Sequence, residues 1–356
     1  MSRPSFRNIL DHSPEELKAA FEKHGLPGFR ADQVLGWIYK KGVYDFAKMP
    51  NLGAETVAKL KEHFDIRMPA VIERQRSGED KSTKLLLKLG NGDLVETVYM
   101  PVKERETVCI SSQVGCKFHC AFCASGQNGF FRNLNQGEIV SQVLLARDVS
   151  KKKKLTNIVF MGIGEPMDNY DNVLKTIRTL NSPKGMGIGA RRITVSTCGV
   201  VPKMERFADE GLQIELSVSL HGPNDLVRGA IMPVNQAFPV KSVLEAAKHY
   251  AAKTGRAITF EYILIKGINA SEAEARSLTK ALKGILCKVN LIPYNPIEEF
   301  PHATPTYNEV VRFQQILEEG GIRTTVRFSK GTDIQAACGQ LRSVKLKEAK
   351  AETIDE

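Results

Sequence analysis

Three cysteines crowd into eight residues of the chain, at Cys116, Cys120 and Cys123. In a reducing compartment such crowding favours metal or catalytic thiols over structural disulfides. Zinc is one interpretation, but a closed zinc site takes four ligands, and the only near candidate for the fourth is His119, awkwardly placed between two of the cysteines. A [4Fe–4S] cluster held by three thiolates leaves one iron open to bind and cleave a small molecule. We therefore favour an iron–sulfur cluster over zinc.

Polar residues and glycines follow the expected strands where each strand ends. Gly164 and Glu165 come after an apolar run over 157–161. Glycine allows close approach of a backbone, and a carboxylate can bind an ammonium group. Each residue alone could form a turn or cap a helix, but together they favour one ligand site. The ends of three further strands carry the remaining candidates: Ser196, Ser219, Leu220, His221 and Asn295.

The elements that position these residues alternate between apolar runs typical of strands and helical patterns. Six such strand-then-helix units predict an α/β fold with a parallel sheet, an incomplete (β/α)6 barrel whose site lies at the carboxyl ends of its strands. A last strand is expected over 324–328. The six runs cover residues 108–111, 157–161, 193–196, 214–220, 258–265 and 288–293.

The first part of the chain has a different pattern, from which we expect a small helical domain over 1–75. Ser13 with Glu16 forms a capping box for one helix, and a second helix follows Gly28. Residues 83–89 and 94–100 flank an Asn-Gly turn, which predicts a linking β-hairpin within 76–104. The catalytic barrel should then span 105–343, and a polar tail 344–356.

Composition limits the function. The 356 residues carry a formal net charge of +10, a surface bias that favours a polyanionic partner, although a solvated basic surface would look the same. The start lacks the apolar core of a signal peptide, and no run approaches the length of a membrane span. We expect a cytoplasmic protein that does not engage the membrane.

The C-x3-C-x2-C spacing resembles the signature of the radical S-adenosylmethionine (SAM) superfamily. That resemblance implies a [4Fe–4S] cluster on the three cysteines and SAM at the neighbouring strand ends. Glu165 would hold the ammonium of the methionine moiety, the serines would face the ribose, and Asn295 the adenosine.

Two further cysteines make the resemblance more specific. Cys109 lies seven residues ahead of Cys116, and Cys338 stands far downstream. With these, the chain resembles the RlmN/Cfr family of RNA adenine methyltransferases from about 29 to 342, most closely its RlmN branch. Supporting motifs occur at residues 29–33, 95–98, 127–129 and 132–134.

The resemblance implies methylation of carbon 2 of an adenosine in the peptidyl-transferase centre of 23S rRNA and, in some members, of a tRNA anticodon-loop adenosine. That carbon lies between two ring nitrogens and is too electron-poor to attack SAM. Cys338 would therefore carry the methyl group, Glu96 would remove the ring proton, and Cys109 would resolve the RNA–protein link through a transient disulfide with Cys338. A flavodoxin-type electron donor, a thioredoxin-type thiol reductant and a monomeric enzyme are also implied.

Other interpretations remain open at this point. A Cfr-like enzyme acting on carbon 8 shares every cysteine named above, whereas another radical SAM chemistry would not need Cys109 or Cys338. A non-catalytic RNA-binding protein with structural zinc is a further alternative. Cys109 and Cys338 could be small buried residues, the role expected for Cys198 and Cys287, and Glu96 could be an exposed strand residue. RNA contacts are expected from the helical domain and from basic residues at 151–154, 191 and 192.

Overall fold

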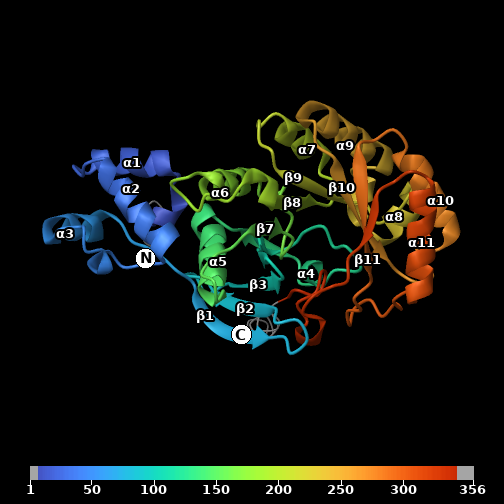
Figure 1. Ribbon diagram of the computed structural model, residues 1–356, viewed down its shortest axis with the longest axis horizontal. Coiled ribbons are helices and arrows are strands. Elements are labelled where there is room, and N and C mark those ends of the chain that lie inside the picture. Colours follow the sequence, from blue (N-terminus) through green and yellow to red (C-terminus); the bar gives the residue numbers. More distant parts are fainter. Residues whose placement is uncertain (1–6, 343–356) are drawn as a thin grey trace, which may run out of the picture.

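The computed structural model describes residues 7–342. Its amino-terminal part consists of helices that lie to one side of a large sheet (Figure 1). They are α1 (Pro14–Lys23), α2 (Phe29–Leu35) and α3 (Ala54–His63), with a π-helical turn at Gly36–Lys41 directly after α2. The capping box expected at Ser13 and Glu16 is present at the start of α1. The sequence therefore located the first two helices correctly.

One ten-stranded sheet dominates the rest of the molecule, in the order β1-β2-β3-β4-β7-β8-β9-β10-β11-β12. Neighbours from β1 to β4 are antiparallel, and from β4 to β12 they are parallel. The sheet does not close on itself, as expected for an incomplete barrel. The strands are β1 (Ala70–Arg76), β2 (Thr83–Lys88), β3 (Leu94–Val102), β4 (Arg105–Cys109), β7 (Asn157–Phe160), β8 (Ile193–Thr197), β9 (Glu215–Ser219), β10 (Ile258–Leu264), β11 (Cys287–Pro293) and β12 (Thr324–Val326).

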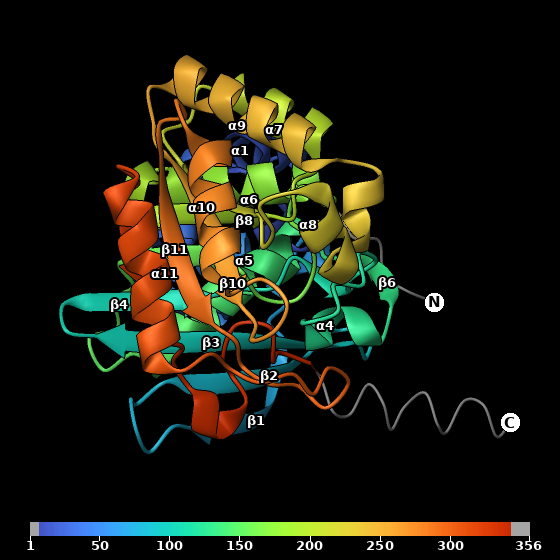
Figure 2. The same ribbon diagram turned by 90° about the vertical axis from the view of Figure 1, so that its right-hand side faces the viewer.

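Helices cover the outer face of the parallel strands (Figure 2). Capping boxes at Asn135, Ser271 and Thr306 fix the starts of α5, α10 and α11. Each parallel strand from β4 to β11 is followed by a helix of this outer layer, so the six expected strand-then-helix units are confirmed. The helices are α5 (Gln136–Val149), α6 (Tyr170–Asn181), α7 (Val201–Ala208), α8 (Asp225–Ile231), α9 (Val240–Thr254), α10 (Glu272–Leu282) and α11 (Tyr307–Glu319).

Four elements were not expected from the sequence. β1 pairs with β2 and so extends the expected hairpin to three strands, continuous with the main sheet. Its side chains are mostly exposed, with three apolar residues followed by four polar ones, so it lacks the apolar alternation by which strands are found. The strands β5 (Gln113–Gly115) and β6 (Phe130–Asn133) form a separate hairpin around the cysteine segment, which also contains the short helix α4 (Ala124–Gln127).

The hairpin of β5 and β6 depends on glycine at its closest point. Gly115 has φ of 74°, and a Cβ there would lie 2.0 Å from the carbonyl oxygen of Gly129. Only glycine tolerates that approach. The hairpin therefore fixes both ends of the segment that carries the three crowded cysteines. Within residues 7–342, no helix is both long enough and apolar enough to cross a membrane.

Candidate active site

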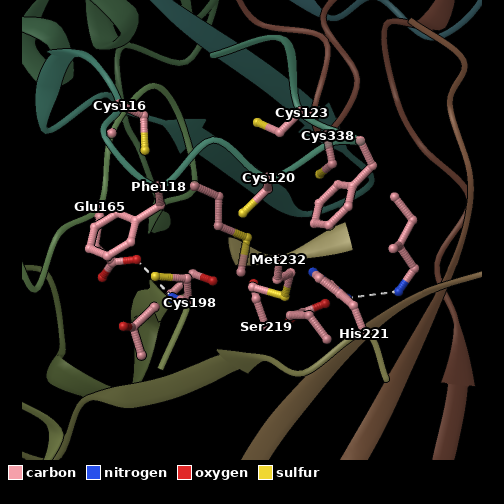
Figure 3. Close-up of a pocket in the computed structure, with 18 of the residues that line it drawn as sticks. Cys116, Phe118, Cys120, Cys123, Glu165, Cys198, Ser219, His221, Met232 and Cys338 are labelled. Atoms are coloured by element: carbon pink, nitrogen blue, oxygen red, sulfur yellow. Dashed lines mark hydrogen bonds between the residues drawn. The ribbon is translucent and has the colours of Figure 1, made fainter. Parts of the chain in front are cut away.

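A pocket opens where the parallel strands end, between those ends and the cysteine loop. Figure 3 shows Cys116, Cys120 and Cys123 on one side of it, and Glu165, Ser219 and His221 on the other. The structure thus brings together residues that lie far apart in the sequence. The candidates that line the pocket are Cys116, Cys120, Cys123, Gly164, Glu165, Ser196, Ser219, His221 and Cys338.

The three-cysteine loop is held by backbone hydrogen bonds at its start and in its second half. The amide of Cys116 donates to Gly129 at 2.9 Å, and the amide of Ala121 donates to Ile231 at 2.9 Å. Burial raises the pKa of the Cys116 thiol to about 12 and also raises those of Cys120 and Cys123. Such thiols stay protonated until a metal centre replaces the protons.

The three thiols lie around one cavity. Among residues 7–342, no three His, Cys, Asp or Glu side chains converge closely enough to bind a single metal ion. His119, the one candidate for a fourth zinc ligand, is exposed and does not line the pocket. Three thiols distributed around a cavity fit a multi-iron cluster, whose ligands bind different iron atoms.

Glu165 is a buried carboxylate held by the backbone. Its Oε2 accepts a hydrogen bond from the amide of Cys198 at 2.7 Å, and its Oε1 from the amide of Met167 at 2.9 Å. Burial raises the pKa of Glu165, and these two amides oppose the shift. The side chains of Thr197 and Cys198 also contact this carboxylate, which lines the pocket and can bind a ligand ammonium there. The preceding Gly164 has φ of 101°, and a Cβ there would meet Gln113 at 2.5 Å, so only glycine fits.

His221 is neutral at physiological pH. Its Nδ1 accepts a hydrogen bond from the amide of Ile263 at 3.0 Å, and burial lowers its pKa to about 3. The proton of the neutral ring is then on Nε2, a donor for a ligand. Leu220 differs from its neighbours because its side chain is fully buried in the core. It can offer a ligand only backbone atoms.

Cys338 lies on the loop after β12, and three contacts fix its segment. The Nδ2 of Asn295 donates to the carbonyl of Cys338 at 3.2 Å, and the amide of Ala124 donates to the carbonyl of Gly339 at 2.7 Å. The hydroxyl of Ser125 donates to the carbonyl of Leu341 at 2.7 Å. Together they place the Cys338 side chain beside Cys123 (Figure 3). Asn295 does not itself line the pocket.

Cys109 lies at the end of β4, buried beneath the Cys338 segment. It packs against Ala336 and Leu341 on either side of Cys338. Burial raises the pKa of the Cys109 thiol to about 12, the Cys338 thiol adds to this, and the Arg327 guanidinium opposes it. Both cysteines are free thiols. The two therefore lie near each other without a disulfide between them.

Glu96 is buried, contrary to the alternative in which it is an exposed strand residue. It is 3% exposed, and its Oε1 lies 3.5 Å from the Nζ of Lys84, while its Oε2 has no hydrogen-bond partner among residues 7–342. Burial raises its pKa to about 7, and Lys84 and the backbone amide of Arg342 oppose the shift. Glu96 therefore lies next to the segment that follows Cys338, although it does not line the pocket.

Sequence reasoning missed several residues at the site. Arg327 and Glu261 line the pocket, as do Met232 and Cys198. A glutamate within the otherwise apolar run over 258–265 was the available signal for Glu261. Arg228 is fully buried behind the site and donates from Nη2 to the carbonyl of Cys198 at 2.6 Å. It supports the strand end that orients Glu165.

The open parallel sheet with a three-cysteine loop after its first parallel strand defines a radical SAM enzyme. Residues 110–278 match the model of the Radical SAM superfamily, and residues 7–66 match the ribosomal RNA large subunit methyltransferase N-terminal domain. The crystal structure of a radical SAM methyltransferase from Sphaerobacter thermophilus superposes with a TM-score of 0.91 at 42% identity, covering 94% of this chain and 99% of that one.

Curated relatives identify the family. The chain is 45% identical to a probable dual-specificity RNA methyltransferase RlmN of Clostridium perfringens, over 94% of this chain and 96% of the relative. It is 44% identical to a protein of the same name from Dictyoglomus turgidum, over 98% and 99%. The chain belongs to the RlmN family of radical SAM methyltransferases. Its cofactors are accordingly a [4Fe–4S] cluster and SAM.

Proposed function

We propose that this enzyme methylates carbon 2 of an adenosine in the peptidyl-transferase centre of 23S rRNA, and a tRNA anticodon-loop adenosine, through a methyl group carried by Cys338. One observation carries the proposal. Cys338 lines the pocket, and the thiol of Cys109 is buried close behind it, near enough for the two thiols to affect each other's charge. The names of the relatives, which are dual-specificity RNA methyltransferases, support RNA as the substrate.

The residues on the two sides of the pocket would bind different cofactors. Cys116, Cys120 and Cys123 would hold the cluster, whose role when bound is to supply the electron that cleaves SAM. Glu165 would bind the ammonium of SAM, and the Nε2–H of His221 and the hydroxyls of Ser196 and Ser219 suit its sugar. The contacts of Asn295 support a different task, the anchoring of the Cys338 segment.

Cys338 is suited to carry a methyl group because its thiol faces the pocket. The sulfur would form a bond to the methyl carbon of SAM while the sulfonium bond breaks, and the thiol proton leaves to solvent. The carried methyl group would later lose one hydrogen atom to the radical chemistry that the cluster and a second SAM supply, and its carbon would join carbon 2 of adenine, which links RNA to Cys338. When the ring proton leaves, the remaining electron would return to the cluster. The unpartnered Oε2 of Glu96 is the acceptor available to take the ring proton.

Release of the RNA requires a second thiol close to the first. Cys109 would lose its proton and attack the sulfur of Cys338, forming a disulfide between the two residues. The carried carbon would leave with the bonding electron pair and take up a proton, which completes the methyl group on adenine. A dithiol reductant of the thioredoxin class would then supply two electrons and restore both thiols. The high pKa of Cys109 keeps it protonated and inert until that stage.

The position of methylation is tested by product analysis. Reconstituted enzyme is incubated anaerobically with SAM, a reductant and an unmodified 23S rRNA fragment, and the nucleosides are identified by mass spectrometry. We expect 2-methyladenosine from the wild type and none from Cys338→Ala. A carbon-8 product would instead support the Cfr-like alternative. Product from Cys338→Ala at the wild-type rate would refute the carrier role.

A further inference from the structure

A second cavity lies at the opposite, amino-terminal end of the same strands. It has a volume of about 870 Å³. It is lined by residues that lie two apart along the parallel strands, such as Glu215 and Ser217 on β9. The next residue on the same face of β9, Ser219, lines the active-site pocket instead. Met161, Glu261 and Arg327 line both cavities. The two spaces therefore adjoin inside the partial barrel.

The lining of this lower cavity is polar. Closed barrels of the (β/α)8 type fill the corresponding space with branched apolar side chains. Here the inward positions of β10 carry Thr259 and Glu261, and those of β11 carry Lys288 and Asn290. In the part of the chain that the structure describes, Oε2 of Glu261 is buried without a hydrogen-bond partner. A buried acceptor without a donor at the junction is available to a donor group on a ligand, such as an amino group.

Positive charge exceeds negative charge around the lower cavity. Arg191 and Arg192 line it, and no ion pair of either is found within residues 7–342. Glu215 is already paired, with Arg256 and with Lys288. Burial lowers the pKa of Arg256, and the nearby charge of Arg191 lowers it further. Cations crowded to this extent favour an anionic ligand.

An exposed aromatic ring at the cavity favours nucleic acid over other anions as its ligand. Phe328 lines the cavity, is 60% exposed, and lies between Arg327 and Lys330 in the chain. Aromatic rings beside cations are the usual means of binding single-stranded RNA, since bases stack on the ring while the cations contact phosphates.

We propose that the lower cavity is the RNA entrance: Arg191 and Arg192 bind phosphates of the strand, Phe328 stacks on a base, and the target nucleotide passes by Glu261 to reach Cys338. This rests on RNA being the substrate, as proposed above. The entrance lies opposite the three-cysteine loop, so RNA and SAM approach Cys338 from different ends of the barrel.

The phosphate contacts are tested by RNA binding to the anaerobically reconstituted holoenzyme. We measure the affinity for a fluorescent anticodon stem-loop by anisotropy at several salt concentrations. Arg191→Ala/Arg192→Ala should bind roughly tenfold or more weakly near physiological salt, with a slope of log affinity against log salt lower by roughly 1.5. The control Lys241→Ala/Lys248→Ala removes two exposed charges from α9 and should match the wild type. Iron and sulfide contents show that each variant has folded.

The stacking contact is tested in the same assay. Phe328→Ala should bind roughly tenfold more weakly and Phe328→Trp close to wild type, while Tyr307→Ala, an exposed aromatic at the start of α11, should have no effect. Unchanged affinity and salt slope in the double arginine variant, or unchanged affinity in Phe328→Ala, would overturn the entrance. If the variants bind weakly but the wild type never methylates adenosine, the proposed function fails while the entrance stands.

Discussion

The side-chain amide of Asn295 donates a hydrogen bond to the carbonyl oxygen of Cys338 at 3.2 Å, and a second one to the hydroxyl of Ser329 at 2.7 Å. The loop after β11 thus holds the segment that carries the reactive thiol. The resemblance to radical SAM enzymes implies instead that Asn295 faces the adenosine of SAM. Holding the Cys338 segment and binding the adenosine of SAM predict different defects when Asn295 is replaced.

A substitution at Asn295 separates these roles. Asn295→Asp keeps the size of the side chain but replaces the donating amide by an acceptor, which repels the Cys338 carbonyl. We expect slower methylation of Cys338 with nearly unchanged affinity for SAM, both measured on reconstituted enzyme. A large loss of SAM affinity with normal Cys338 methylation would instead restore the adenosine-binding role.

The raised pKa of Glu96 predicts the pH dependence of the reaction. As a base Glu96 must be ionised, and burial brings its pKa to about 7. The rate of RNA methylation in a single turnover should therefore rise with pH up to that value and level off above it. Glu96→Gln should be slower by about a hundredfold or more, without this dependence. Glu79→Gln, an exposed carboxylate in the β1–β2 turn, is the control, and a wild-type rate in Glu96→Gln would refute the assignment.

The same pKa has a consequence for stability. The folded-state pKa of Glu96 lies above the ordinary value of 4.5, because burial disfavours the ionised carboxylate. The contribution of Glu96 to the free energy of unfolding is therefore largest while the group is protonated, and it is lost as pH rises through about 7. The full shift corresponds to about 3 kcal/mol. Glu96→Gln should gain free energy of unfolding relative to the wild type between about pH 4.5 and pH 7 and keep that gain at higher pH. A constant difference across that range, measured by urea unfolding, would contradict the shift.

Much of the fold could be predicted from the sequence because its strands and capping boxes are local patterns. The runs over 157–161 and 258–265 became β7 and β10 within a residue of their ends. β1 could not be found, because its stability comes from pairing with β2 and its side chains are solvated. Arg327 was missed for a related reason, since only the three-dimensional fold brings it to Cys338.

The choice of metal is tested by single substitutions in the cysteine loop. Cys120→Ala should lose the cluster, and with it the iron, sulfide and brown colour measured after anaerobic reconstitution. His119→Ala should keep them, because His119 is exposed. Stoichiometric zinc in colourless wild-type protein would contradict this expectation and support a structural zinc site.

The helical domain is attached to the barrel by a buried arginine. Arg147 of α5 donates to the carbonyl of Tyr39 at 2.6 Å and to the hydroxyl of Tyr44 at 2.8 Å. Arg147→Met should destabilise the protein by about 3 kcal/mol, since it leaves buried acceptors unpaired. Trp37, the only tryptophan of the chain, reports unfolding by fluorescence.

The matched control for that substitution is an exposed arginine. Arg178 pairs with Glu210 at 2.7 Å and is 54% exposed, so Arg178→Met should cost about 1 kcal/mol or less. Equal losses in the two variants would mean that Arg147 does not join the domains.

The account depends on Cys338 carrying the transferred carbon, and peptide mass spectrometry tests this directly. Holoenzyme is incubated with SAM, digested, and the peptide containing Cys338 is compared before and after addition of RNA and reductant. We predict one added methyl group on Cys338 that disappears as methylated adenosine forms, with Cys198 unmodified throughout. RNA methylation while Cys338 remains an unmodified thiol at every time point would contradict the account.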